Sequence, residues 1–453
     1  MYKNILFLCW LAFLISCKKE PVVPPGGDPA EFAAPFTGVP GLEDMVFYEV
    51  NMRAYSQAGD FKGVQARLDD IKALGVNIIW LMPVHPVGKI KSVGELGSPY
   101  AVQNYTAVNP EFGALADLQN LVKEAHDRQM AVVIDWVANH TAWDNPWTTD
   151  HRDWYTQDAS GNIQTPAGQN WPDVADLNYN SPDMRKAMIK AMKYWVLRAN
   201  IDGFRCDAAD LIPFDFWRQA IDTLRNMPNR DLIMLAEGSR DDHFTAGFQL
   251  NYGWNFYEAT KNVFRTGTSA DIFSATHTAE YDSLPANTGL LRFTTNHDES
   301  AWEGSPITQL GGKKGAFTAF LITTYLGGVP LIYGGQEVAR SETTPFFSKS
   351  PIDWTANNDY QADYRQIMTF RQSSAALRKG TLESFPNSTI VVFKKKYLSE
   401  EVLVIANPRN STVNYTVASA LANTGWKNAL TEADYVLGTG LTLQPYDYLI
   451  LKK

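Results

Sequence analysis

Cysteine and positive charge are both scarce in this 453-residue sequence. It contains three cysteines, and 40 Lys and Arg residues stand against 49 Asp and Glu residues, for a formal net charge of −9. The acidic balance argues against nucleic-acid binding, because nucleic-acid phosphates need a basic surface. A hydrophobic content of 45% excludes a disordered or collagen-like chain. The length fits two or three domains, or one large α/β domain with an appendage, and buries a sizeable core without disulfides.

The first 16 residues predict an export signal. Lys3 precedes a short apolar run over 5–15, which is too short to span a bilayer as a stable helix. The run ends in the sequence LISC, which resembles the lipobox of bacterial lipoproteins. That resemblance implies a signal peptide over 1–16, a lipid anchor at Cys17 and an exported outer-membrane lipoprotein on the cell surface or periplasmic face. An ordinary secretory signal or a tail anchor is the alternative.

Removal of the signal leaves one cysteine, Cys206, in the folded part of the chain. No intrachain disulfide can form there, so the core alone must stabilise an exported protein. The Pro and Gly residues between 21 and 29 favour an extended, unpacked chain, which predicts a lipidated tether over 17–41.

From residue 45 the chain alternates between strand-like and helix-like segments. Eight strand candidates are 45–55, 77–84, 131–137, 203–207, 231–237, 247–256, 290–296 and 329–334. Helical patterns lie between them at 61–74, 114–128, 182–199, 213–226, 312–326 and 360–378. Eight βα units predict an α/β fold, a (β/α)8 TIM barrel over 42–378. An open doubly wound sheet is the alternative, but no glycine-rich phosphate turn follows the first strand.

Two regions depart from the βα alternation. Residues 139–180, after the third strand candidate, are irregular and rich in Trp, Asp, Asn and Pro. They predict a short insert in the barrel. Residues 379–453 contain short strands separated by turn residues, which predict a C-terminal all-β sandwich domain.

Polar residues cluster where four of the predicted strands end, which is where a barrel of this type places its active site. Arg205 and Asp207 are two residues apart, so their side chains share one face of a strand. The arginine would keep Asp207 ionised, which suits a nucleophile. Glu237 ends the next strand and can donate a proton if its pKa is raised. One charged and one protonated carboxyl, about 5–5.5 Å apart, is the arrangement of a retaining glycosidase.

Four motifs make this pattern specific. The segments DWVANH, GFRCDAAD, AEG and FTTNHD, in this order and spacing, resemble the signature regions of the α-amylase superfamily of glycoside hydrolases, family 13. Further similarity lies in ADLN at 175–178, in GVPLIYG at 328–334 and in the loop around 97–108. The resemblance covers about residues 45–453. It implies a (β/α)8 barrel, with the irregular insert as domain B and the β tail as domain C.

The resemblance also implies catalytic roles for individual residues. Asp207 matches the nucleophile, and Glu237 matches the general acid/base. Asp298 matches the third carboxylate, which grips sugar hydroxyls and distorts the ring. Arg205 matches the arginine beside the nucleophile, and Asp135 matches the aspartate that supports this arginine.

Three further residues match substrate-binding positions of the family. Tyr100 matches the aromatic platform under the sugar, and His140 and His297 match the histidines that hydrogen-bond its hydroxyls. Tryptophans near the predicted mouth are candidates either for sugar stacking or for packing within the insert: Trp143, Trp147, Trp154, Trp171 and Trp302.

One departure concerns the residues after the nucleophile. Many α-amylases carry a Lys-His pair where this chain has Asp210 and Leu211, which leaves the leaving-group subsites and the calcium site open. Asn139 and Asp176 match family calcium ligands, but two oxygens fall short of the about six to eight that calcium takes. Loop and helix capping is their alternative role. We expect that no cofactor is required, with calcium as the one candidate.

The sequence therefore predicts a lipid-anchored α-glucan hydrolase that cleaves internal α-1,4 bonds of starch or maltooligosaccharides. Alternatives within the family are a cyclomaltodextrinase or neopullulanase, an α-1,6-glucosidase and a glucanosyltransferase. A glucan-binding lipoprotein without catalytic activity is the alternative outside enzyme chemistry. We expect a monomer whose partners are an α-glucan and a membrane.

Overall fold

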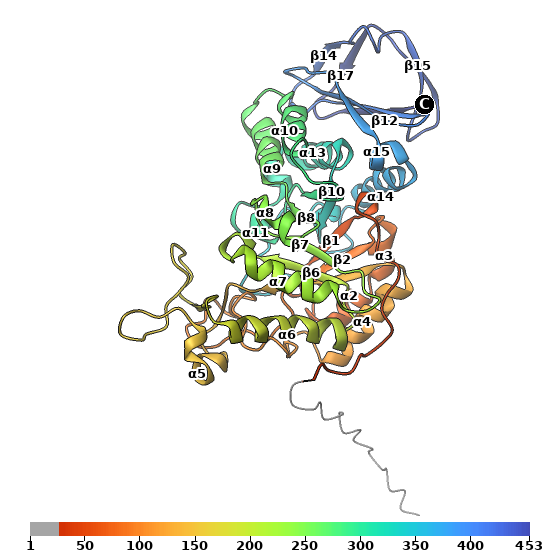
Figure 1. Ribbon diagram of the computed structural model, residues 1–453. Coiled ribbons are helices and arrows are strands. Elements are labelled where there is room, and N and C mark those ends of the chain that lie inside the picture. The colour runs from red at the N-terminus through yellow and green to blue at the C-terminus, as the bar shows by residue number, and fades with distance from the viewer. Residues whose placement is uncertain (1–26) are drawn as a thin grey trace, which may run out of the picture.

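A closed parallel barrel forms the centre of the protein in a computed structural model, which describes residues 27–453 (Figure 1). Its strands follow one another around the barrel in the order β1-β10-β9-β8-β7-β6-β3-β2. Their bounds are β1 Phe47–Val50, β2 Ile78–Leu81, β3 Ala131–Val137, β6 Gly203–Asp207, β7 Ile233–Ala236, β8 Leu250–Tyr252, β9 Gly289–Arg292 and β10 Val329–Tyr333. Phe47 pairs with Leu331, so the first and last strands close the barrel and confirm the predicted (β/α)8 fold.

Strand alternation divides the barrel strands between two apolar layers. Phe47, Ile78 and Val133 belong to the cluster inside the barrel, while Tyr48 and Ile79 belong to the larger cluster between the sheet and the helices. Because successive side chains point to opposite faces, the residue two positions after an inward one also points inward. The barrel interior is therefore apolar near the start of the strands and becomes polar where they end.

Helices of the barrel surround the sheet and lie close to the predicted ranges. They are α1 Met52–Tyr55, α2 Phe61–Gln65, α3 Leu68–Ala73, α4 Leu115–Asp127, α6 Pro182–Arg198, α7 Phe214–Arg225, α8 Asp242–Ala246, α9 Trp254–Lys261, α10 Ile272–Tyr281, α11 His297–Trp302, α12 Pro306–Gln309, α13 Gly312–Leu326, α14 Asn358–Ser373 and α15 Ala375–Lys379. Short turns of 3-10 or π helix are η1 Leu42–Asp44, η3 Ala209–Leu211, η4 Asn262–Thr266 and η5 Gln336–Val338. The helix predicted over 61–74 is instead two helices, because the chain leaves helical geometry at Arg67, where φ is −116° and ψ is 12°.

The insert after β3 contains little regular structure. It consists of β4 His140–Ala142 paired antiparallel with β5 Val174–Asp176, together with α5 Trp147–Asp150 and η2 Arg152–Trp154. Its loops project away from the barrel beside α5 (Figure 1). The short β4–β5 pair fixes the base of the insert at the carboxyl end of the barrel.

The C-terminal region consists of antiparallel sheets, as predicted. Six strands pair in the order β11-β12-β13-β18-β15-β16, and β14 pairs with β17. Their bounds are β11 Thr381–Ser384, β12 Val391–Tyr397, β13 Glu400–Ala406, β14 Val413–Thr416, β15 Thr424–Asn428, β16 Asp434–Leu437, β17 Gly440–Leu443 and β18 Tyr448–Lys452. The two sheets enclose their own apolar cluster, and the domain packs beside α13 and α15 (Figure 1).

The N-terminal part of the described chain lies against the amino ends of the barrel strands. Phe36 stacks on His126 of α4 at a ring distance of 4.2 Å, and Val39 packs against the apolar cluster inside the barrel. Residues 36–41 of the predicted tether thus cover the face opposite the strand carboxyl ends. Nearer the N-terminus, Asp28 pairs with Lys193 of α6, and Gly27 and Pro29 lie near Trp147 of the insert. The predicted signal peptide and Cys17 lie outside the described residues.

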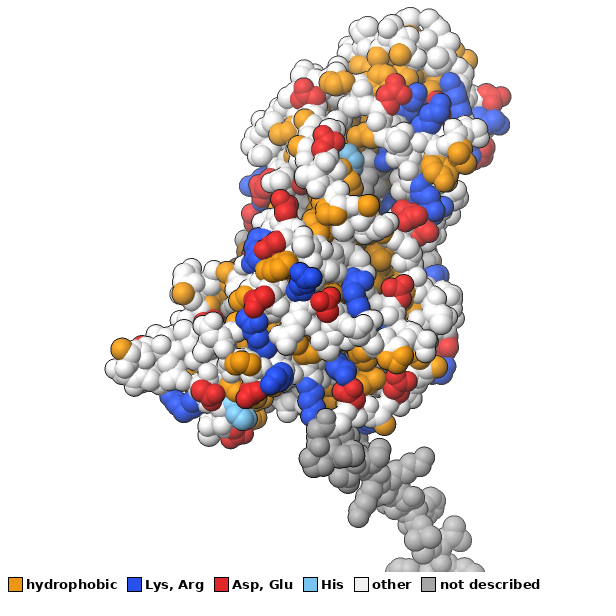
Figure 2. Space-filling view, viewed as in Figure 1, with side chains coloured by type: hydrophobic (Ala, Val, Ile, Leu, Met, Phe, Trp, Pro, Cys, Tyr) orange, Lys and Arg blue, Asp and Glu red, His pale blue; other side chains and the backbone are white. Residues whose placement is uncertain are grey.

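Two surface properties bear on the predicted partners. Acidic and basic side chains alternate over the visible face, with no broad field of one sign (Figure 2). No helix within residues 27–453 has the length and apolar composition needed to cross a bilayer.

Candidate active site

A cavity of about 500 Å³ opens at the carboxyl ends of the barrel strands. It is lined by all three predicted catalytic carboxylates, by two of the predicted sugar-binding residues and by several aromatic side chains: Asp207, Glu237, Asp298, Tyr100, His140, Trp171, Trp302, Phe346 and Phe347. The structure therefore brings together groups from β6, from the loops after β2, β3, β7 and β10, and from α11. This convergence is what the (β/α)8 fold produces from residues far apart in sequence.

Arg205 lies beneath the cavity and contacts three carboxyl groups. The side chain is fully buried, and its Nη1 lies 3.1 Å from Oδ1 of Asp207 and 2.9 Å from Oδ1 of Asp135. Its Nη2 lies 2.6 Å from Oε1 of Glu237. One guanidinium thus holds the two predicted catalytic carboxyls close together, which favours direct attack by one of them over a mechanism that places a water between them.

The protonation of this pair differs from the sequence-based expectation, in which Arg205 acts on Asp207 alone. Burial is the largest influence and raises the pKa of both Asp207 and Glu237. The charge of Glu237 raises the pKa of Asp207 further, and that of Asp298 raises the pKa of Glu237, while Arg205 lowers both. Because the two groups are buried against one another, the pair retains a proton at a pH at which isolated carboxyls have lost theirs.

The backbone after the predicted nucleophile holds Glu237 in place. The N–H of Ala208 donates to Oε2 of Glu237 at 2.8 Å, and the N–H of Ala209 donates to the Glu237 carbonyl at 2.9 Å. Ala208 adopts a left-handed conformation with φ of 42°, which is costly for a residue with a Cβ atom. This turn links the ends of β6 and β7.

Asp135 is buried on β3 and accepts three hydrogen bonds. Arg205 donates to Oδ1, while the Tyr100 hydroxyl at 3.0 Å and Nε1 of Trp80 at 3.3 Å both donate to Oδ2. Tyr100 also lies over His297 with its ring centroid at 5.4 Å and an interplanar angle of 20°. Trp80 is not among the site residues predicted from the sequence. It lies on β2 and belongs to the apolar cluster inside the barrel.

The two cavity histidines have opposite electrostatic environments. Burial lowers the pKa of His140 to about 4, so this imidazole is neutral at neutral pH. Burial also opposes charge on His297, but the carboxylates of Asp298 and Glu49 outweigh it and raise its pKa to about 9. Glu49 is not among the site residues predicted from the sequence. Its one signal there is a charged residue within the otherwise apolar first strand.

Asp298 reaches the cavity from the first turn of α11. Asn296 caps this helix, because its side chain accepts a hydrogen bond from the N–H of Glu299 at 2.9 Å. The cap starts the helix at His297, after the short segment 293–296 that follows β9, and fixes where His297 and Asp298 leave the backbone. Oδ2 of Asp298 lies 3.3 Å from Nε2 of His297.

The five candidate tryptophans separate into two groups. Trp302 is 67% exposed at the rim of the cavity and stacks on Phe346 at 5.6 Å, and Trp171 lines the insert side of the cavity. Trp147 and Trp154 pack edge to face at 5.0 Å within the insert. The ring of Trp143 is covered by the Lys91 ammonium at 3.4 Å. Only the first two are placed to meet a bound ligand.

The calcium ligands implied by the sequence do not form a complete donor set. His140 pairs with Asp176 across the short β4–β5 ladder. Because Asn139 precedes His140 in the sequence, Asn139 and Asp176 lie near each other. Asn139 directs its side-chain nitrogen to Nδ1 of His140 at 3.3 Å. Within residues 27–453 no three acidic, histidine or cysteine side chains converge as a metal site would require. No step below depends on calcium.

Asp210, the first residue of the predicted departure after Asp207, binds the loop after β7. Its carboxylate accepts hydrogen bonds from the N–H of Ser239 at 3.0 Å, the N–H of Arg240 at 3.2 Å and the Ser239 hydroxyl at 3.1 Å. Arg240 in turn donates to the Asp210 carbonyl at 3.0 Å. The departure in sequence thus creates a brace between two active-site loops.

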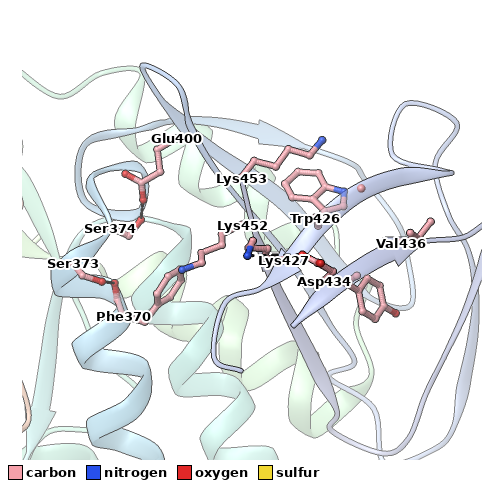
Figure 3. Close-up of a pocket in the computed structure, with 12 residues that line it drawn as sticks. Phe370, Ser373, Ser374, Glu400, Trp426, Lys427, Asp434, Val436, Lys452 and Lys453 are labelled. Carbon is pink, nitrogen blue, oxygen red and sulfur yellow. Dashed lines mark hydrogen bonds and ion pairs between the residues drawn. The ribbon is translucent and has the colours of Figure 1, made fainter. Parts of the chain in front are cut away.

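A larger cavity, of about 710 Å³, lies between the end of α14 and the C-terminal sheet (Figure 3). Its acidic groups are already bound, because Glu400 accepts a hydrogen bond from Ala376 N–H at 3.2 Å and Asp434 lies 3.8 Å from the Lys427 ammonium. Lys453 covers the Trp426 ring at 4.0 Å. The cavity contains no pair of free carboxyl groups, so the chemistry belongs to the smaller cavity.

Comparison with known proteins agrees with this geometry. Residues 43–381 match the family described as the alpha amylase catalytic domain. Alpha-amylase 3 of Dictyoglomus thermophilum is 24% identical over 494 residues, which span 91% of this chain and 94% of that protein. Neopullulanase 2 of Thermoactinomyces vulgaris is 27% identical over 433 residues, 87% of this chain and 70% of that protein. The crystal structure of an alpha-amylase from Lactobacillus plantarum aligns with a TM-score of 0.81 and 28% identity, covering 91% of this chain and 99% of that one.

Proposed function

The chain belongs to the α-amylase family of glycoside hydrolases, and from this premise we propose that it cleaves internal α-1,4-glucosidic bonds of starch or maltooligosaccharides with retention of configuration. Asp207 and Glu237 share the buried Arg205 guanidinium at the cavity where Asp298 also emerges. Two adjacent carboxyls that hold a proton between them can supply a nucleophile and an acid in one active site.

The reaction follows from these positions. Asp207 attacks the anomeric carbon and forms a glycosyl ester, while Glu237 gives its proton to the leaving glycosidic oxygen. Glu237, now ionised, takes a proton from a water, and this water releases the sugar from Asp207. Two inversions at the anomeric carbon give net retention of the α configuration. Arg205 stabilises each carboxylate as it carries charge.

The other cavity residues position the sugar at the reacting centre. Tyr100 and His140 line the cavity and are the proposed contacts of the sugar, and Nε2 of His297 lies 2.6 Å from the Tyr100 hydroxyl. Asp298 binds hydroxyls in competition with water, which helps to hold a distorted ring. The exposed Trp302 and its partner Phe346 extend the apolar surface from this point to the rim, which suits a chain of several glucose units.

The direct test is Glu237→Gln in the full chain. We expect hydrolysis of starch to fall by about a hundred- to ten-thousand-fold, because the general acid is lost while the shape of the side chain is kept. Glu400→Gln, in the larger cavity of Figure 3, is the matched control and should retain activity. Equal starch turnover in the wild type and Glu237→Gln would show that the mechanism is wrong.

The preferred linkage is a separate part of the proposal. The similarity to Neopullulanase 2 supports a cyclomaltodextrinase or neopullulanase as the second candidate. An α-1,6-glucosidase and a glucanosyltransferase are tested by the same assay. Chromatography of the products from maltoheptaose, pullulan and cyclodextrin separates these activities, and release of transfer products alone would contradict a hydrolase. Binding without turnover of any of them would instead favour a glucan-binding lipoprotein.

We further propose an exported monomer that is anchored through Cys17 and needs no cofactor. Cys17→Ser should move the protein from the membrane fraction to the soluble exported fraction. A variant that stays with the membrane would contradict the lipid anchor.

A further inference from the structure

Glu49 is a carboxyl group enclosed within the barrel, outside the predicted set of site residues. It follows Phe47 by two positions on β1, so both side chains face the barrel interior. The residue is 0% exposed, and its Oε2 has no hydrogen-bond partner among the described residues. A buried charge is costly unless it is paired, so its surroundings must compensate for this carboxyl.

That compensation comes from His297. Oε1 of Glu49 lies 2.5 Å from Nδ1 of His297, and this contact joins the first strand of the barrel to the start of α11. The carboxyl occupies one ring nitrogen completely. Nε2 of His297 is then the one ring nitrogen left to contact Tyr100 and Asp298, and its role depends on whether it carries a hydrogen.

The other side of the ring shows that Nε2 carries a hydrogen. The Tyr100 hydroxyl lies 2.6 Å from Nε2 of His297 and 3.0 Å from Oδ2 of Asp135. Asp135 accepts from Arg205 at Oδ1 and from Trp80 at Oδ2, and the Tyr100 O–H also donates to Oδ2. The tyrosine oxygen must then accept from His297, which requires an N–H at Nε2.

From this geometry we propose that Glu49 is a positioning residue, which keeps an extra proton on the Glu49–His297 pair so that Nε2 of His297 keeps the hydrogen that it donates to the Tyr100 hydroxyl and thereby holds the Tyr100 ring at the cavity. The proton count is the same whether the shared proton lies on Nδ1 or on Oε1. In both cases Nε2 keeps its hydrogen. The catalytic consequence rests on the proposed function, but the protonation of the pair does not.

The surrounding charges agree with this assignment. Asp298 and Glu49 favour the extra proton, and Arg205 opposes it. Glu237 also faces this group, because the charge on His297 lowers the pKa of Glu237. Tyr100 lies between His297 and Asp135 and is itself kept neutral, because burial raises its pKa. The two adjacent carboxylates outweigh burial, and the pKa of His297 lies at about 9.

The test is a histidine titration by NMR on ligand-free full-length protein with 15N-labelled histidine, with His297 assigned from His297→Asn. In the wild type, His297 should stay doubly protonated until the pH approaches 9. Glu49→Gln keeps the shape and the acceptor oxygen but removes the charge, so the titration should fall by about one pH unit or more. Glu49→Asp keeps the charge and should restore part of the shift.

Glu337→Gln is the matched control. Glu337 is a buried glutamate after β10 that accepts from the Tyr48 hydroxyl at 2.5 Å and has no contact with His297 among the described residues. Its removal should leave the His297 titration unchanged, which separates the effect of Glu49 from the loss of any buried carboxyl.

Two results would overturn the proposal. One is a wild-type His297 that titrates near its ordinary pH of about 6.5, a result that needs no folded variant. The other is the same titration in wild type and Glu49→Gln. Steady-state kinetics add a second readout, in which Glu49→Gln should lower kcat/KM about tenfold, most of it at alkaline pH. Because the titration requires no substrate, it stands even if the proposed reaction is wrong.

Discussion

At the scale of single residues, exposure separates the aromatic side chains that can meet a ligand from those that support the fold. Trp302 leaves two thirds of its surface open at the cavity rim, whereas Trp154 is 8% exposed. Each is the last residue of a short helical element, and sequence spacing does not distinguish them. The difference arises because α11 directs Trp302 to the rim, while Trp154 packs against Trp147 and His151.

Trp302→Ala tests the role of the rim. We expect KM for maltooligosaccharides to rise about tenfold with a smaller change in kcat, because a stacking surface that lies away from the reacting bond contributes about 1–2 kcal/mol of binding. Steady-state kinetics on maltoheptaose provide the measurement. Trp143→Ala is the control, since Lys91 already covers that ring, and it should leave KM near the wild-type value. Equal KM values in all three proteins would remove Trp302 from the substrate path.

At the scale of elements, the ends of β6 and β7 behave as one unit. The turn at Ala208 donates to the Glu237 side chain, and Asp210 binds the backbone of Ser239 and Arg240 immediately after it. The proposed nucleophile and general acid are therefore held by reciprocal contacts between two loops. Precise placement of catalytic groups requires such support, because small displacements reduce the rate strongly.

Asp210→Asn should reveal this brace. The amide replaces a charged acceptor by a weaker one, and its nitrogen would face N–H groups, so we expect kcat to fall about tenfold. KM should change less, because Asp210 acts through the position of Glu237. Ser239→Ala removes only the hydroxyl contact and should have a smaller effect on kcat. If Asp210→Asn changed KM alone, Asp210 would be a substrate contact.

At the scale of the whole molecule, buried cations lie at the junction between the barrel and the C-terminal domain. Lys395 on β12 is 6% exposed and donates to the Leu326 carbonyl at the end of α13 at 3.3 Å. Burial and the neighbouring Arg371 lower its pKa from 10.5 to about 8. A charge in this position opposes folding, and the junction is therefore less stable at neutral pH than its apolar contacts alone would make it.

Lys395→Met should stabilise the protein at pH 7. The lowered pKa corresponds to about 3 kcal/mol, and loss of the hydrogen bond offsets about 1 kcal/mol, which leaves a gain of about 2 kcal/mol. Below pH 8 the lysine is charged in both states, and between pH 8 and 10.5 the folded state releases its proton first. Wild-type stability therefore rises relative to the variant over that window.

Calorimetric Tm values at pH 7 and pH 10 measure this effect. The advantage of Lys395→Met should shrink as the pH rises. Lys396→Met, at the neighbouring half-exposed position on β12, controls for the loss of a lysine as such. An advantage that grows with pH would reverse the sign of the argument.

The segment before the barrel supplies a second test at this scale. Phe36 stacks on His126 and packs against the apolar cluster at the amino end of the barrel, so Phe36→Ala should lower the free energy of unfolding by about 2 kcal/mol. Phe32 is 42% exposed, and Phe32→Ala should change it by less than about 0.5 kcal/mol. Denaturant unfolding at constant pH gives both values. Equal losses of unfolding free energy in Phe36→Ala and Phe32→Ala would show that the packing of Phe36 does not stabilise the barrel.

Sequence alone determined the barrel, its strand positions and the carboxylates at the strand ends, because buried parallel strands have continuous apolar patterns and the motifs are local. Asp207, Glu237 and Asp298 could therefore be selected without a structure. Only the tertiary structure decided which other groups reach them. Glu49 meets His297 and Arg205 contacts both Asp207 and Glu237 because barrel closure joins residues distant in sequence. Burial then sets their protonation, and burial is a property of the assembled fold that no local pattern contains.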